Sequence, residues 1–493
     1  MKIKFNKNKI KTKAKAAKNC QTNIQVRGSG RGFRSGVWVG PQCGSMLIYL
    51  VVIIFIFSLV MLPILSNIVK EMQVLRSSTY REEALQIADA GVNYYQWHLA
   101  HFPTDYQDGT NAPGPYVHNY VDTSTQQTIG EFSLSITPPL AGSTIVTIIS
   151  TGWTNSDPNI KRTVTARYGI PSLARYAFLS NDVVWIGSQE NVSGTLMSNN
   201  GVRFDGTTNA PVESAKSTYT CPASQGTPCP ATENGVWGAG NSNFWQYPVP
   251  AVDFSSLTAT MANLQNLAQS GGIFLPPSNA QGYSLVFNSD GTVSVYKVTS
   301  LQGNPQGWDV YGRPQHQNTD YNNRTLLFTD PIPSNGIIYV EDTTWVEGTV
   351  NGRATVAAGM LPYNPNSSPS IYIPNSITYA AKDGSDVLGL IAQNNLALTY
   401  HAPASMEVDA VLVAENGSVQ FFYYPDNVKN TLTVFGSIIT YGQWTWTWLN
   451  GQGQPQAGYE TTYDTYDANL LYSPPPSFPL SNSGYQLLSW SSN

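Results

Sequence analysis

The stretch GSMLIYLVVIIFIFSLVMLPILSNIV, residues 44–69, decides how the chain is organised. The 24 residues from Met46 to Val69 include no charged side chain, and about 20 residues of helix are enough to cross the hydrocarbon core of a membrane. Pro63 is expected to kink this helix, which a membrane helix tolerates better than a soluble one. The stretch therefore predicts one membrane-spanning helix.

No breaker directly follows the apolar run, and the helical pattern continues beyond it. Apolar residues recur at spacings of mostly three and four, which is typical of an amphipathic helix; they are Met72, Leu75, Ala84, Ile87, Ala88, Val92, Tyr95 and Leu99. We therefore expect residues 45–100 to form a transmembrane helix fused to an amphipathic stalk. A plain single-pass anchor with a helical stalk fits the same hydropathy.

This arrangement resembles the N-terminus of type IV pilin-like proteins, and more narrowly their minor-pilin branch. The matching residues are Gly44-Ser45-Met46-Leu47 before the span and Ala84, Ala88 and Gly91 after it. The resemblance implies cleavage after Gly44 by a prepilin peptidase and methylation of the new N-terminus at Ser45. It also implies that the helix packs against other pilin subunits in a filament, through Tyr49, Pro63, Ala84, Ala88 and Gly91.

The chain departs from the pattern of major pilins at one position. Those proteins carry a glutamate at the fifth residue of the mature chain, where it pairs with the N-terminal amine of a neighbouring subunit. Here that position is Tyr49, and the leader is also unusually long. Both departures favour a minor or tip-like subunit that serves adhesion or filament initiation.

Charge is distributed unevenly along the chain. Residues 1–43 hold eight Lys and three Arg but no acidic residue, so only 15 of the 26 basic residues remain beside all 31 acidic residues. The positive-inside rule places the basic leader, residues 1–44, in the cytoplasm and the acidic bulk outside. We expect a single-pass protein of the inner (cytoplasmic) membrane that later joins a cell-surface filament. An acidic ectodomain argues against nucleic acid as a partner.

Two cysteines would remain after cleavage, Cys221 and Cys229 in YTCPASQGTPCPA. Two cysteines that close a short loop outside the cell predict a disulfide. The alternative is half of a metal site, but no second cysteine pair or nearby histidine completes one. We therefore expect no metal and no cofactor.

The remaining chain is expected to be mostly β. Alternating runs at 101–170 predict a small antiparallel sheet that forms a pilin-like head and covers the apolar face of residues 84–99. Residues 171–330 form a β-rich region with the disulfide loop, a helix-compatible stretch at 254–269 and a hairpin at Asp290-Gly291.

Residues 331–445 are the most regular part of the chain. Short apolar strands centred on Val346, Tyr372, Ile391, Leu412 and Phe435 recur at steps of 26, 19, 21 and 23 residues. Such steps favour a right-handed parallel β-helix, with an antiparallel sandwich as the alternative. Residues 446–493 form a Pro-rich and aromatic tail. The fold class is thus an α+β pilin-like unit followed by a mostly β region.

Catalytic signatures are weak. Carboxylates such as Glu347, Asp409 and Glu415 allow a membrane-anchored β-helical polysaccharide-active enzyme as an alternative, but nothing in the pattern fixes them on one face. We therefore expect no enzymatic activity. Aromatic rows could stack on the sugars of a surface glycan or a host cell, or pack against a neighbour, unless they belong to strand cores. The candidates are Tyr423, Tyr424, Trp444, Trp446 and Trp448.

Overall fold

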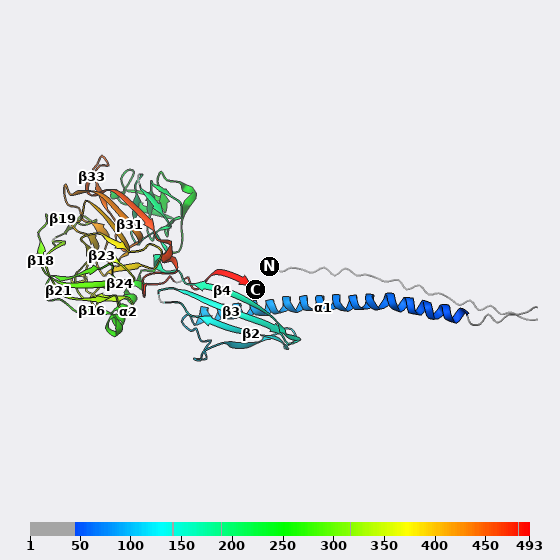
Figure 1. Cartoon of the computed structure of the whole chain (residues 1–493). Coiled ribbons are helices and arrows are strands. Elements are labelled where there is room, and N and C mark those ends of the chain that lie inside the picture. Colours follow the sequence, from blue (N-terminus) through cyan, green and yellow to red (C-terminus); the bar gives the residue numbers. More distant parts are fainter. Residues whose placement is uncertain (1–44, 141, 189, 316, 482) are drawn as a thin grey trace, which may run out of the picture. The chain divides into compact units, whose positions relative to one another are not determined.

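The computed structural model describes residues 45–493 except positions 141, 189, 316 and 482. Gly44 and the basic leader therefore lie outside the described residues. The chain divides into two compact units, one that ends at Val74 and one that runs from Leu75 to Asn493. Helix α1 (Ser45–His101) contributes residues to both units (Figure 1).

The first unit contains the apolar half of α1. Leu47, Ile53 and Leu62 are 68, 65 and 65% exposed, so the described residues of this unit do not cover them. Among the described residues, α1 is the one helix that is long and apolar enough to cross a membrane. The helix is continuous through Pro63, whose carbonyl accepts a hydrogen bond of 2.9 Å from the Ser66 hydroxyl; the expected kink stays a prediction.

The second unit begins with a head in which α1 packs on an antiparallel sheet. The sheet contains β1 (Tyr116–Val121), β2 (Thr128–Thr137), β3 (Ile145–Thr154), β4 (Asp157–Gly169) and β34 (Gln486–Ser492), in that order. Ile87, Val92 and Leu99 of α1 are buried in one core with the sheet. The expected cover for the apolar face of residues 84–99 is confirmed.

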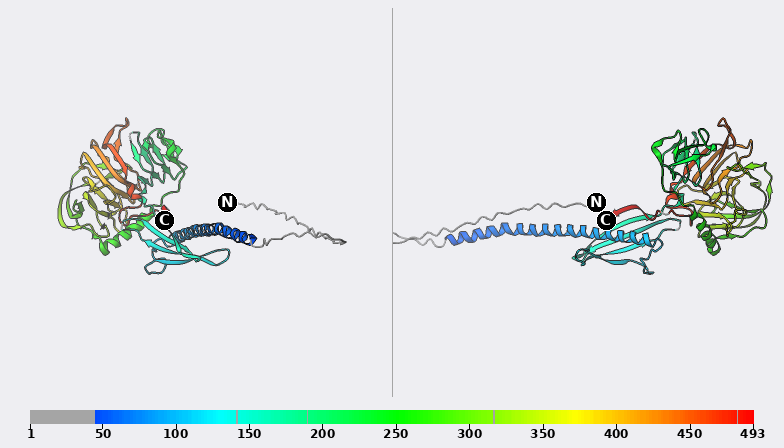
Figure 2. Two further views of the ribbon diagram at one scale, coloured as in Figure 1. Left: turned by 45° about the vertical axis from the view of Figure 1, so that its right-hand side comes forward. Right: turned by 180° about the vertical axis from the view of Figure 1, so that it is seen from behind.

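The last strand of the head comes from the end of the chain. β34 pairs antiparallel with β4, with Trp490 opposite Ala166, and Figure 2 shows this red strand beside the head. The prediction that residues 446–493 form a tail is therefore wrong in its C-terminal part. The sequence between β4 and β34 is an insertion into the head sheet, and both of its ends meet where Ser172 pairs with Leu480.

The insertion is built from parallel strands that stack in three columns. In the first column each strand pairs with the next, in the order β16 (Ile273–Leu275), β22 (Ile337–Val340), β24 (Arg353–Ala358), β27 (Val387–Ala392), β29 (Ser405–Ala414), β31 (Val428–Thr440), β5 (Phe178–Ser180), β8 (Leu196–Ser198), β11 (Val212–Ser214) and β15 (Trp245–Gln246). We call the three columns together the parallel stack.

The other two columns follow the same order. The second contains the start of β23 (Thr344–Val350), then β25 (Ile371–Ile373), β28 (Leu396–Leu398) and β30 (Val419–Phe421), and separately β6 (Val184–Ile186), β9 (Val202–Phe204) and β14 (Val236–Trp237). The third contains the end of β23, then β26 (Ile377–Tyr379), the starts of β29 and β31, β33 (Pro455–Tyr466), β7 (Asn191–Ser193) and β10 (Thr207–Thr208).

Chain order and stacking order differ in the parallel stack. The chain enters at β5, builds coils up to β15, and then restarts at β16, at the far end of the first column. From there it returns coil by coil until Ile438 of β31 pairs with Phe178 of β5. Residues 171–330 and 331–445, which we expected to be separate regions, therefore share one stack, and so does β33 from the predicted tail.

Helix α2 (Ser255–Gly271) connects the two ends of the path. Its 17 residues span about 25 Å at 1.5 Å each, which is a little over half of the nine spacings of about 4.8 Å that separate β15 from β16 in the first column. Leu257, Met261 and Leu264 pack on outward side chains of the first column. Because α2 covers the outside, this column is buried on both faces, which explains continuous apolar runs such as Val387–Ala392.

Antiparallel elements decorate the stack. β17 (Gly282–Phe287) and β18 (Thr292–Gln302) form the hairpin predicted at Asp290-Gly291, and β18 pairs in turn with β21 (Asp320–Pro331). The remaining elements are β12 (Thr218–Cys221), β13 (Ala231–Asn234), β19 (Gly307–Trp308), β20 (Pro314–Gln315), β32 (Thr447–Leu449), and short 3-10 helices at Leu173–Arg175, Ala223–Gln225, Ser242–Phe244 and Ala468–Leu471.

The parallel pairing expected for residues 331–445 is present, but the predicted register is wrong. Tyr372 pairs with Ala397 in the second column, whereas Ile391 belongs to the first. The error arises because each coil contributes several apolar strands of similar length. Two strands about 22 residues apart in the sequence can therefore belong to different columns. Asn395 links two successive coils, since its side-chain oxygen accepts from the Ser418 amide at 2.9 Å.

Candidate functional site

The residues implied in filament packing fall into two groups. Ser45 begins α1, and Tyr49 lies on its exposed apolar half with 67% of its surface accessible. Gly44 lies outside the described residues, so cleavage and methylation stay predictions. In contrast, Ala84 and Ala88 are fully buried.

Close packing against the head sheet explains why small residues occupy this part of α1. A Cβ atom added to Gly91 would lie 2.3 Å from the Ser150 hydroxyl, and one added to Gly152 would lie 2.4 Å from the Ala88 amide nitrogen. The small side chains therefore let the helix approach its own sheet. The interpretation of Ala84, Ala88 and Gly91 as contacts to other subunits is wrong.

The predicted disulfide is confirmed between Cys221 and Cys229. The loop it closes lies over a ladder on the outer face of the second column, where Arg203 is in register between Trp185 and Trp237. The guanidinium lies 4.7 and 4.9 Å from the centres of these two rings. Such cation–π contacts stabilise a partly desolvated cation.

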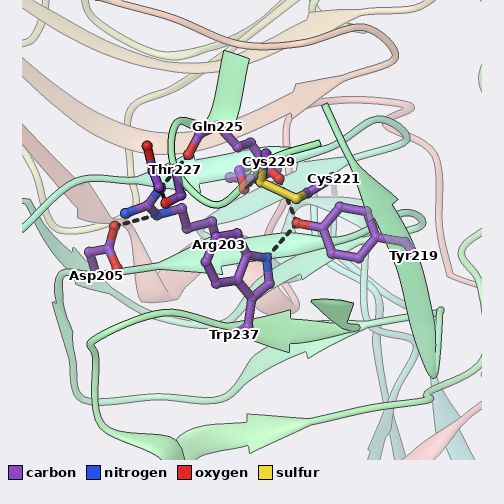
Figure 3. The surroundings of a disulfide bond; sticks show 9 residues. Arg203, Asp205, Tyr219, Cys221, Gln225, Thr227, Cys229 and Trp237 are labelled. Carbon is purple, nitrogen blue, oxygen red and sulfur yellow. Dashed lines mark hydrogen bonds and ion pairs between the residues drawn. A yellow bond between two sulfur atoms is a disulfide. The ribbon is translucent and has the colours of Figure 1, made fainter. Parts of the chain in front are cut away.

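Arg203 also ties the disulfide loop to the ladder (Figure 3). Its Nη1 donates to the carbonyls of Gln225 and Thr227, and its Nε donates to Asp205 at 2.7 Å. On the other side of the loop, the Tyr219 hydroxyl donates to the Gln225 side chain at 2.6 Å and accepts from the Trp237 indole at 2.8 Å. The disulfide thus closes a loop that these hydrogen bonds fix to the second column.

The aromatic residues proposed for ligand stacking are mostly part of the core. Tyr424 is 0% and Trp446 1% exposed, so these two are not available to a ligand and their interpretation is wrong. Trp444 packs edge-on against Phe178 at 5.1 Å. Tyr423 and Trp448 are half-buried and contact each other at 5.5 Å. A ligand role for Trp444, Tyr423 and Trp448 stays a prediction.

The candidate catalytic carboxylates make structural contacts. Glu347 accepts from Arg324 and Tyr321 at 2.8 and 2.7 Å. Asp409 is buried and accepts from Lys382 at 2.8 Å, and Lys382 also donates to Glu407 at 2.6 Å.

Burial raises the pKa of Asp409, and the hydrogen bond from Lys382 opposes that shift. Glu415 is buried as well. No group of three or more His, Cys, Asp or Glu side chains among the described residues could hold a metal ion.

The carboxyl group of Asp464 lies inside the stack. Asp464 of β33 is in register between Val434 and Val192, and its Oδ1 is buried. Burial raises the pKa of Asp464 to about 7, and the nearby Glu190 carboxylate adds to the shift. The period-two pattern of Thr461–Tyr466 gave no signal that this acid faces inward.

Comparisons with known proteins give little more. No family model matches the sequence, and no curated protein matches it. Among solved structures, the chain is similar to the competence-associated pilin ComZ from Thermus thermophilus, with a TM-score of 0.27 and 13% identity over 84% of this chain and 98% of that chain. A TM-score of 0.27 does not establish a shared fold, so function must be argued from the contacts described above.

Proposed function

We propose that the chain is a minor, tip-like pilin subunit of a type IV pilus or a related filament. One observation carries the proposal: a single helix leaves its first half apolar and exposed, and then buries one face of its second half under an antiparallel sheet. An uncovered apolar helix requires lipid or other apolar helices around it. A membrane before assembly and neighbouring subunits afterwards would supply both.

Two features support a place at the end of a filament. Tyr49 carries no charge to pair with a neighbour's N-terminal amine. The insertion between β4 and β34 is also several times longer than the head that carries it, and such a bulk is easier to accommodate once than in every subunit of a shaft. The three columns of parallel pairing are those expected of a parallel β-helix, which this subunit would display for adhesion or filament initiation.

The role we propose is not enzymatic. The acids considered for catalysis lie in ion pairs or beneath the surface of the stack, where they support the fold. A polysaccharide-active enzyme is the second candidate, because Glu347 lies beside an open groove. Incubation of the full chain with neutral and acidic polysaccharides, followed by a reducing-end assay, would show release of new ends only under that second reading.

The filament role can be tested at Tyr49. In a host that assembles filaments, immunogold labelling of this chain is expected at filament ends. Tyr49→Glu restores the missing charge and should move labels along the shaft, whereas Tyr49→Gln, which is close in size but neutral, should leave them at the ends. Labelling that is absent from filaments in every variant would contradict the proposal.

The displayed insertion can be removed by joining the two head strands that flank it. Gly169 and Gln486 are paired neighbours in the head sheet, so an Asn-Gly turn can replace residues 171–484 and join the two strands. We expect this variant to enter filaments as the full chain does and to lose adhesion. Unchanged adhesion would assign that property to another part of the molecule.

A further inference from the structure

An open groove lies on the outer face of the third column. Its floor comes from three successive coils, through β17, β23 and β26, and its wall is β21 of the neighbouring antiparallel sheet. The groove has a volume of about 380 Å³, within the roughly 300–1,000 Å³ of small-molecule sites. The lining side chains are Val286, Arg324, Glu347, Thr349, Ser376 and Thr378.

The groove contains one shielded ion pair. Nη1 of Arg324 donates to Oε1 of Glu347 at 2.8 Å and to the Ser284 hydroxyl at 2.6 Å. The side chains of Arg324 and Glu347 are 25% and 11% exposed. Within the part of the chain that the structure describes, Nε and Nη2 of Arg324 and Oε2 of Glu347 have no hydrogen-bond partner. The N–H groups on Nε and Nη2 of Arg324 and the Oε2 atom of Glu347 are therefore available to a ligand.

Two tyrosines hold this pair in place. The guanidinium of Arg324 lies 4.4 Å from the ring centres of both Tyr296 and Tyr321. The Tyr321 hydroxyl donates to Oε1 of Glu347 at 2.7 Å. Burial raises the pKa of Tyr321, and its hydrogen bond to the Glu347 carboxylate raises it further, so this phenol keeps its proton. Preorganised groups of this kind lose little entropy when a ligand binds.

Hydroxyl groups line the groove beyond the ion pair. Thr349 and Thr378 are paired in adjacent coils, and their hydroxyls lie 3.1 Å apart. Ser376 precedes β26, and its hydroxyl accepts from the Glu407 amide at 3.1 Å. Together with Val286, these side chains offer small polar contacts and methyl groups, which suit the mixed surface of a sugar ring.

We propose that this groove binds a neutral oligosaccharide, with two adjacent hydroxyls of one sugar seated on Arg324 and Glu347. The free guanidinium N–H groups would donate to the hydroxyl oxygens, and Oε2 of Glu347 would accept a hydroxyl proton in a hydrogen bond. The ion pair carries no net charge. The part of the chain after residue 43, with 15 basic and 31 acidic residues, repels polyanions, so the ligand is a neutral rather than an acidic glycan.

This inference rests on the proposed function only in that the stack is displayed outside the cell; binding itself needs no filament. The test uses the full chain in detergent micelles and measures its binding to immobilised cellotetraose, mannotetraose and galactotetraose, with tetragalacturonate as the acidic counterpart. We expect binding to at least one neutral tetrasaccharide and none to tetragalacturonate. Filament labelling, measured separately, would be unaffected by failure here.

Variants of the groove identify the site. Glu347→Gln and Arg324→Lys should each weaken binding by about tenfold or more, as expected when a charged hydrogen bond to the ligand is lost. Thr378→Tyr fills the groove without touching the ion pair and should also abolish binding. Glu407→Gln, on the same column but outside the groove, makes the same chemical change in an exposed ion pair and should leave binding within about twofold.

Thermal unfolding of each variant shows whether it is folded. If Glu347→Gln or Arg324→Lys is unfolded, the binding measured with Thr378→Tyr tests the site instead. Three results would overturn the proposal. They are no binding to any of the neutral tetrasaccharides, tighter binding to tetragalacturonate than to them, or equal binding by the wild type and the folded groove variants.

Discussion

Two apolar regions of similar composition differ in how much of their surface the rest of the chain buries. The first half of α1 and the first column of the parallel stack are both rich in Val, Ile and Leu. α2 and the interior of the stack cover the column from both sides, and Leu390 and Ile391 are fully buried. The described residues of the first unit provide no such cover, and Ile54 is 58% exposed. The comparison shows which apolar surface the chain covers itself and which one needs a membrane or a partner.

The largest effect is expected where the chain supplies its own cover. Leu264→Asp places a charge from α2 against the first column and leaves it unpaired in an apolar layer. We expect a loss of about 4 kcal/mol or more in the free energy of unfolding, measured by urea denaturation. Asn263→Asp, on the exposed side of α2, should change it by less than about 0.5 kcal/mol. Equal stability of the two variants would mean that α2 does not seal the column.

A charge in the exposed half of α1 should reduce membrane association and leave the stability of the second unit unchanged. Ile54→Asp should lower the share of the chain in membranes, because an acid at the centre of a spanning helix costs about 2.5–3.5 kcal/mol. The urea transition of the second unit should be unchanged, because Ile54 lies in the first. Membrane fractionation of wild type and variant checks the expectation. A loss of stability in the second unit would show that the two apolar regions are not independent.

A third effect depends on pH and concerns Asp464, an acid inside the stack. Asp464 has a folded-state pKa of about 7 and an ordinary pKa of 3.8, so the folded state binds more protons between these values. The contribution of Asp464 to stability should therefore fall as pH rises from about 4 to about 7, by at most about 1.4 kcal/mol per pH unit, and level off above 7. Urea denaturation at pH 5, 6 and 7 measures this slope.

Asp464→Asn should make the slope shallower, because the amide does not titrate. The exposed Asp330→Asn serves as its control and should keep the wild-type slope. A slope as steep in the Asp464 variant as in the wild type would place the titrating group elsewhere. Taken with the Ile54→Asp result, a shallower slope would show that the stack accepts an acid in its protonated form, whereas the apolar half of α1 does not accept one without loss of membrane association.

Local patterns in the sequence were enough to predict several elements. The helix over residues 45–100, the sheet that covers Ile87 and Val92, the hairpin at Asp290-Gly291, the helix near 254–269 and the disulfide were all correct. Each depends on periodicity, a turn signal or a short loop, which are properties of neighbouring residues.

Features that depend on distant residues were missed. The pairing of β34 with β4 joins strands more than 300 residues apart, and nothing local marks Trp490 as the partner of Ala166. The seam between β31 and β5 reverses the order expected from the chain. The groove was missed for the same reason. Arg324 comes from β21 and Glu347 from β23, and only the tertiary structure brings the two side chains together.

The most direct test of the proposed pilin role is the N-terminal sequence and mass of the mature protein, purified from membranes that contain a prepilin peptidase. We expect a chain that begins at Ser45 with a methylated amine, because the peptidase would cut after Gly44. An intact chain that begins at Met1 would contradict it and leave a membrane-anchored surface protein in its place.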